Sequence, residues 1–118
     1  MAKLRNSKTV LLRSARSEES ADSSLYDAAN RLSELAKALI STESIDTMRG
    51  IEGAAATIYF SCFDRMLGAA CPFRFETRSR RPPKNEVNAV LSFAYTLLRR
   101  EVASALETVG LDPAAGYL

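Results

Sequence analysis

The chain has 118 residues, of which 47% are hydrophobic and 25% are charged, and its formal net charge is +2. This composition predicts one modest globular domain and excludes a chain that is disordered throughout. Because no apolar stretch approaches the roughly 20 residues that span a bilayer, and residues 1–16 lack the apolar core of a signal peptide, we expect a cytoplasmic protein without a membrane segment.

The first part of the chain predicts two helices. Sparse apolar positions over Lys3–Arg16 indicate a first helix, and Ser17–Ser24 is a polar connector. Leucines and alanines then recur at spacings of three and four residues, which predicts a second helix over Ser24–Ile40 with its first residue as the N-cap. The polar run Ser41–Ser44 ends this helix, because serine and threonine side chains compete for backbone hydrogen bonds.

Two further helices are predicted, each capped by its first residue, over Ser44–Leu67 and Asn85–Thr108. A proline-bracketed loop, Cys71–Lys84, separates them, and Gly110 stops the last helix. The residues expected on the buried face of the last helix are Val87, Val90, Leu91, Ala94, Leu97, Leu98, Val102 and Leu106. Because no alternating pattern predicts a strand, we expect an all-α fold: a compact, single helical domain, residues 1–118, of about four to five helices.

The stretch RGIEGAAATIYF, residues 49–60, places Glu52 between Gly50 and Gly53 in the third predicted helix. The apolar period continues past the glycines, so Glu52 is expected to project from a mostly buried helix. One interpretation is a structural ion pair with Arg49, three residues earlier. The other is an oxygen ligand for Mg²⁺ or Mn²⁺, with small neighbours leaving space for the ion and a phosphate. One carboxylate alone cannot hold a catalytic metal ion.

The run RSRRPPK, residues 78–84, has four cations within seven residues. The candidates for DNA binding in this run are Arg78, Arg80, Arg81 and Lys84. Arginine offers forked donors to phosphate oxygens, which favours phosphate contact, and the alternative is a solvated loop stiffened by proline. Arg99 and Arg100 are expected on a solvated helical face. Since the chain has no histidine to activate a serine or cysteine, nothing indicates nucleophilic catalysis.

Three segments together resemble a known family. They are RGIEGAAATIYF, RSRRPPKNEVNAVLSFAYTLLRREV and GLDPAAGYL, which with the lead-in AKLRNSKTVLLR cover nearly the whole chain. In order and approximate spacing they resemble the helical C-terminal domain of the CRISPR-associated integrase, the adaptation protein that inserts new spacers. The ordered set is stronger evidence than any one segment.

The resemblance implies that Glu52 is one of three metal-liganding, catalytic residues. The other two are a histidine directly after the G-[FY]-L ending of the last segment and an acidic residue somewhat further on, and neither lies within the sequence, which ends at Leu118. Nothing in the chain resembles the family's N-terminal β-rich domain, and Asn85 stands where an aspartate is frequent. We therefore expect an inactive fragment, with metal binding weak or absent.

For the parent protein the resemblance implies a metal-dependent DNA endonuclease and integrase that serves adaptive immunity against foreign DNA. Mg²⁺ or Mn²⁺ is the implied cofactor, with Glu52 as a ligand rather than a base. The implied partners are DNA, a second copy in a homodimer, and the small ferredoxin-like second adaptation protein. The alternative is a non-catalytic helical module that binds DNA or a partner protein through its basic loop and basic first segment.

Overall fold

A computed structural model describes residues 2–17, 23–68 and 70–115 of the chain. These residues form five helices and no strand, which confirms the predicted all-α class. The chain divides into two compact units, Met1–Pro72 and Phe73–Leu118, and each is described by itself. The expectation of a single domain stays a prediction.

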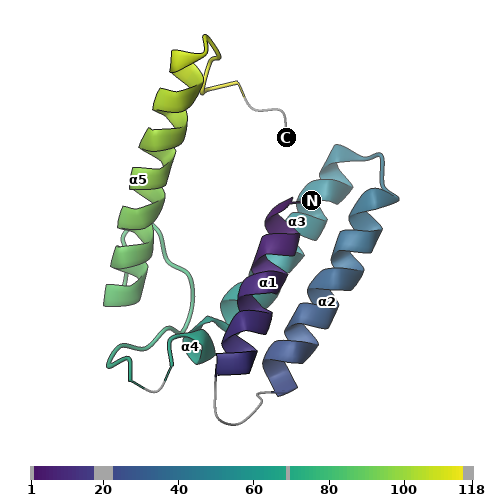
Figure 1. Ribbon diagram of the computed structural model, residues 1–118, viewed down its shortest axis with the longest axis vertical. Helices are drawn as coiled ribbons and strands as arrows, with labels where there is room; N and C mark the ends of the chain where they lie inside the picture. Colours follow the sequence, from purple (N-terminus) through teal and green to yellow (C-terminus); the bar gives the residue numbers. More distant parts are fainter. Residues whose placement is uncertain (1, 18–22, 69, 116–118) are drawn as a thin grey trace. The chain divides into compact units, whose positions relative to one another are not determined.

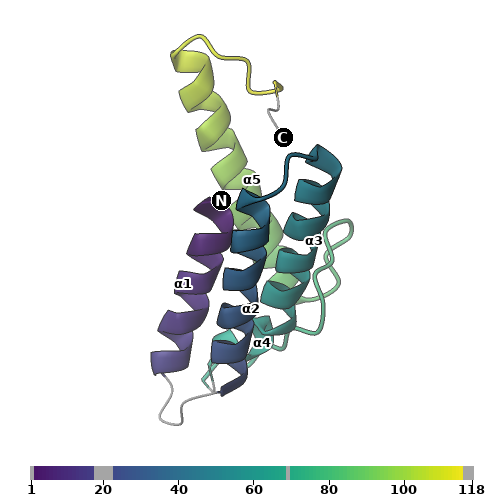
Figure 2. The same cartoon turned by 90° about the vertical axis from the view of Figure 1, so that its right-hand side faces the viewer.

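Unit 1 (Met1–Pro72) is a bundle of three long helices, α1 (Ala2–Ser17), α2 (Ser23–Ile40) and α3 (Ile45–Ser61), followed by the single turn α4 (Phe63–Met66). Successive long helices run in opposite directions and lie side by side in both views (Figures 1 and 2). Ser24 was predicted to be the N-cap of the second helix. It lies inside α2 instead, because Ser23 is already helical.

The core of unit 1 is built from the apolar faces that the helical period predicts, and α2 sits at its centre. Its buried side chains are Leu4, Leu11 and Ala15 of α1, Leu25, Ala28, Ala29 and Leu32 of α2, and Ala55 of α3. Each fully buried leucine contributes roughly 1.5–3 kcal/mol through the apolar area it removes from water. The small alanines allow the helices to approach closely.

The third predicted helix ends earlier than expected, at Ser61 rather than near Leu67. The Ser61 hydroxyl donates a hydrogen bond to the carbonyl of Ile58 at 2.8 Å, the oxygen that the Cys62 amide would use to continue the helix. The Cys62 amide instead bonds to the carbonyl of Tyr59, at 3.3 Å. The Ser61 hydroxyl thus occupies this carbonyl at the residue where α3 ends, and a new turn begins at Phe63.

Unit 2 (Phe73–Leu118) contains a loop and one long helix, α5 (Glu86–Thr108). The side chain of Asn85 accepts a hydrogen bond from the Asn88 amide at 2.9 Å, which confirms the predicted N-cap. At the other end Gly110 has a φ of +77° and the Leu111 amide bonds back to the carbonyl of Leu106. This left-handed glycine cap confirms the predicted stop.

The prediction that one face of α5 is buried is wrong for unit 2. Of the eight residues named for that face, only Val87 is buried, whereas Val90, Leu97, Leu98 and Val102 are 46–66% exposed. The reason is physical: within residues 73–115 the only helix is α5, so no second helix of these residues packs against this face. Among the described residues, no helix is long and apolar enough to cross a membrane.

Candidate functional site

Glu52 lies near the middle of α3, and local capping fixes where that helix begins. Ser44 has extended backbone angles and its hydroxyl accepts a hydrogen bond from the Thr47 amide, as the sequence predicts. Asp46 in the first turn adds a negative charge at the positive end of the helix dipole. The prediction that Glu52 projects from a mostly buried helix is wrong, because the buried part of α3 is limited to Ala55 and the Glu52 side chain is 49% exposed.

The partner of Glu52 comes from α1. The ammonium group of Lys3 donates a hydrogen bond to Oε1 of Glu52 and forms an ion pair with it. Nη1 of Arg49 instead lies 3.8 Å from Oδ1 of Asp46, with which it forms an ion pair. The expected structural pair between Arg49 and Glu52 does not form. The hydrogen bond from Lys3, and the attraction of its charge, hold the pKa of Glu52 below its ordinary value, against a smaller effect of burial. Glu52 is therefore a carboxylate at neutral pH.

Small residues stand close to Glu52 in the sequence of α3. Gly50, Gly53 and Ala54 are exposed on the same helix. A Cβ atom added at Gly50 or Gly53 would have no described atom within 4 Å, apart from the nearby backbone of its own helix. The glycines therefore do not serve close packing in this chain, and they leave the carboxylate accessible to a large molecule.

The described residues do not by themselves make a metal site at Glu52. Within residues 2–17, 23–68 and 70–115, no three histidine, cysteine, aspartate or glutamate side chains are grouped closely enough to hold a metal ion. Mg²⁺ and Mn²⁺ need several oxygen ligands, and here one carboxylate faces an ammonium group. Glu52 can contribute one oxygen ligand, and the described residues bring no cluster of further carboxylate, histidine or cysteine side chains to it.

The basic run lies in unit 2, just before α5. Arg80, Arg81 and Lys84 are exposed, as a phosphate-binding surface requires. Arg78 differs, because it is only partly exposed and its guanidinium nitrogens donate to Ser79, Asn88 and Ser92. Three of the four predicted cations are therefore exposed, and phosphate contact by all four stays a prediction.

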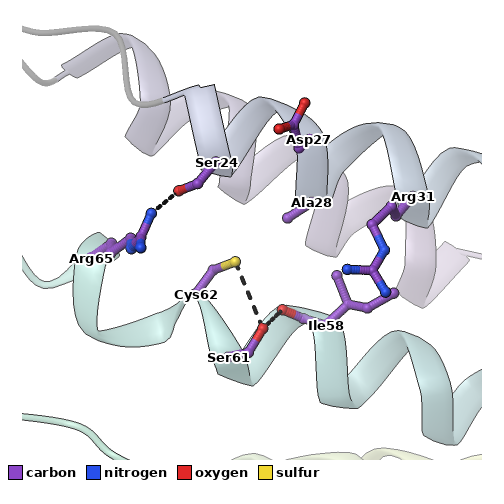
Figure 3. Close-up of a pocket in the computed structure, with 8 residues that line it drawn as sticks. All are labelled: Ser24, Asp27, Ala28, Arg31, Ile58, Ser61, Cys62 and Arg65. Carbon is purple, nitrogen blue, oxygen red and sulfur yellow. Dashed lines mark hydrogen bonds between the residues drawn. The ribbon is translucent and has the colours of Figure 1, made fainter.

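Unit 1 also has a pocket of about 280 Å³ between α2 and the end of α3, which the sequence did not indicate (Figure 3). On one side of it, Oγ of Ser61 lies 3.9 Å from Sγ of Cys62. Arg65 donates a hydrogen bond across it to the Ser24 hydroxyl. Asp27 and Arg31 line it from α2, so its charges are mixed. Glu52 does not line this pocket, and Cys62 is a free thiol with no histidine in the chain to activate it.

Comparisons with known proteins agree over the whole chain. A family model described as "CRISPR associated protein Cas1" matches residues 1–118. The chain is 45% identical to the CRISPR-associated endonuclease Cas1 1 of Chlorobaculum tepidum over 121 residues, covering 100% of this chain and 35% of that protein.

Two other relatives show the same pattern. The CRISPR-associated endonuclease Cas1 of Leptospira interrogans is 40% identical, with 98% of this chain and 47% of that protein covered. The CRISPR-associated exonuclease Cas4/endonuclease Cas1 fusion of Geobacter sulfurreducens is 42% identical, with 99% of this chain and 22% of that protein covered. The chain thus spans less than half the length of each of these three relatives.

Proposed function

The chain belongs to the Cas1 family of CRISPR-associated proteins, and from that premise we propose that it supplies part of the catalytic domain of a DNA endonuclease and integrase that inserts new spacers into a CRISPR array. The observation that carries the proposal is the position of Glu52. It is an accessible carboxylate, flanked by small residues, at the place where the family resemblance implies a catalytic glutamate.

The reaction we propose is a transesterification. A free 3′-hydroxyl of DNA loses its proton and forms a bond to a phosphorus atom of the repeat, while the bond from that phosphorus to its own 3′-oxygen breaks and the departing 3′-oxygen takes up a proton. The number of phosphodiester bonds is unchanged, so the step needs no external energy source. Because its pKa is lowered, Glu52 is ionised at neutral pH, so its oxygens can contribute a metal ligand, which is the role that the family resemblance implies.

Mg²⁺ or Mn²⁺ is part of this proposal, with Glu52 as one ligand. The further ligands, a histidine and an acidic residue by the family resemblance, would lie outside the 118 residues, which contain no histidine. We therefore propose that the 118-residue chain alone is inactive. Homodimerisation, the small second adaptation protein and a cytoplasmic location also belong to the proposal.

The test of Glu52 is a joining assay with the longer protein that carries this segment. Glu52→Ala should abolish joining of a 3′-hydroxyl end to a repeat while the helical circular dichroism stays unchanged. The matched control is Asp46→Ala, which removes a more exposed carboxylate from the same helix and should leave joining near the wild-type rate. If Glu52→Ala joins DNA normally, the segment is not catalytic, and the alternative of a helical binding module is favoured.

We propose that the exposed cations of the basic loop bind the DNA backbone. Removing one phosphate-binding cation should reduce the slope of log affinity against log salt concentration by about 0.9 on duplex DNA. Replacing Arg80 and Arg81 with alanine should thus lower the slope by about 1.8, equally for unrelated sequences. The matched control replaces the exposed pair Arg99 and Arg100 of α5, which should change the slope less. An unchanged slope in the Arg80/Arg81 variant would reduce the run to a solvated loop.

A further inference from the structure

The buried polar side chain of unit 2 is Asn88, in the first turn of α5, with an exposed fraction of 0%. A buried carboxamide costs free energy unless all of its donors and acceptors find partners. Its neighbour Val87 is apolar and contributes to burial in the ordinary way. Asn88 therefore requires an explanation that hydrophobic packing does not provide.

The carboxamide of Asn88 makes four hydrogen bonds with the loop that precedes α5. Its Oδ1 accepts from the backbone amide of Ser79 at 2.9 Å and from Nη1 of Arg78 at 2.8 Å. Its Nδ2 donates to the backbone carbonyl of Thr77 at 2.8 Å and to Oδ1 of Asn85 at 2.9 Å. The side chain thus binds residues on both sides of the basic run.

The chemistry of these partners requires a carboxamide. The Ser79 amide and the Arg78 guanidinium are donors only, so the atom that faces them must be an acceptor. The Thr77 carbonyl is an acceptor only, so the atom that faces it must be a donor. Aspartate would accept from the two donors but could not donate to the Thr77 carbonyl, and an apolar residue could do neither.

These bonds close the base of a loop with the basic residues at its tip. A further bond crosses the base, from the Lys84 amide to the Ser79 hydroxyl at 2.9 Å. Arg80, Arg81, Pro82 and Pro83 lie between the two fixed ends, and all four are exposed. The prolines restrict the backbone further, because their φ angles are fixed.

Arg78 joins the same network from its own side of the loop. Nη2 donates to the Ser92 hydroxyl at 3.3 Å, and the guanidinium carbon lies 5.8 Å from the centre of the Tyr95 ring. No ion pair of Arg78 occurs within the described ranges, and its Nε is buried without a hydrogen-bond partner there. A charge retained without a carboxylate partner adds to the positive potential of the loop.

We propose that Asn88 is a positioning residue for DNA binding: it fixes the base of the 77–85 loop so that Arg80, Arg81 and Lys84 contact one DNA backbone together. The inference rests on the proposed DNA contact of this loop. A loop that is ordered before binding loses less conformational entropy when it meets its ligand, so more of its contacts form at once. Removing the carboxamide should therefore weaken binding, although Asn88 is buried and cannot touch DNA.

The test is a double-mutant cycle in DNA binding, measured by fluorescence anisotropy with a short duplex over a range of salt concentrations. Asn88→Ala should lower the salt slope by the equivalent of one to two phosphate contacts, about 0.9–1.8. In a variant that already lacks Arg80, Arg81 and Lys84, adding Asn88→Ala should cause no additional decrease in slope. Thr96→Ala is the matched control, because its hydroxyl bonds only within α5, to the Ser92 carbonyl, and it should not alter binding.

A second readout separates positioning from general unfolding. The Ser79 and Lys84 amides should lose protection from hydrogen exchange in Asn88→Ala, while the helical circular dichroism is kept. If that variant fails to fold, Asn88→Asp replaces it in the cycle, because it keeps both acceptor contacts and loses both donations, and its slope should lie between those of wild type and the variant lacking Arg80 and Arg81.

Two results overturn the inference, and they differ from each other. If the removal of Arg80 and Arg81 lowers the slope but neither Asn88 variant does, or if the Asn88 effect adds fully to the effect of removing Arg80, Arg81 and Lys84, the positioning role is wrong and the DNA contact stands. If the removal of Arg80 and Arg81 itself leaves the slope unchanged, the proposed DNA contact fails and the positioning role fails with it.

Discussion

Removing the ammonium group of Lys3 tests the electrostatics of the candidate site. In the structure this group is the hydrogen-bond donor to Glu52 and the main cause of its lowered pKa. Lys3→Ala should therefore raise the pKa of Glu52 toward the ordinary value for glutamate. A pH titration of the Glu52 side-chain carboxyl signal by NMR measures this directly.

The effect on stability should be small, because the two side chains are 69% and 49% exposed and water screens their attraction. Ion pairs at such positions contribute about 0.2–1 kcal/mol. Since folding lowers the pKa of Glu52, this contribution is fully present above about pH 4.3, where an unfolded glutamate is ionised, and is lost as the pH falls through the lower pKa of the folded state. Urea unfolding of wild type and Lys3→Ala at pH 7 and pH 3 should show a smaller difference at the lower pH.

The matched control is Lys37→Ala, which removes an exposed pair with Glu34 inside α2 at a separation of three residues. It should have a similarly small effect on stability and none on the pKa of Glu52. The reasoning is refuted if the pKa of Glu52 is the same in Lys3→Ala and wild type, or if Lys37→Ala shifts it equally.

Three substitutions test the packing and the backbone. Leu32→Ala leaves a cavity at a position that is 1% exposed and should lower the free energy of unfolding by about 2–5 kcal/mol. Ile40→Ala, at 69% exposure, should change it by less than about 0.5 kcal/mol. Equal urea midpoints of the two variants would contradict the described core. Gly110→Ala forces a side chain into a φ of +77° and should destabilise by about 1 kcal/mol, so an unchanged melting temperature would be evidence against the helix cap. Gly53→Ala should stabilise α3 by about 0.5–1 kcal/mol because nothing in the described residues crowds it, and a decrease in stability would indicate a packing role.

Helical periodicity predicted where the helices lie. It predicted which of their faces are buried for α2 but not for α5. The first four apolar residues of the α2 pattern are buried, because α2 has neighbours on two sides in its own unit, and the later ones are partly buried. The pattern of α5 names an apolar face correctly, but periodicity does not say whether another element covers that face. The end of α3 was missed because the apolar period continues past Ser61, where the hydroxyl bonds to the carbonyl of Ile58.

The candidate site was predicted in part. The position of Glu52 and its environment of small residues were visible in the sequence, but its partner was not, because Lys3 lies 49 residues away and spacing rules consider only nearby positions. Asn88 was also missed. The signal available was an asparagine three residues after the N-cap asparagine, a spacing at which side chains can satisfy free backbone groups at the start of a helix.

The central claim is that the charge of Glu52 serves the chemistry of DNA joining, and the rate of joining by Glu52→Gln tests it most directly. Glutamine keeps the shape of the side chain and removes its negative charge, so a structural role would be largely preserved. In the longer protein that carries this segment, the account predicts a loss of 3′-hydroxyl joining nearly as complete as in Glu52→Ala, with unchanged melting temperature and DNA affinity. Joining at near the wild-type rate by Glu52→Gln would contradict it.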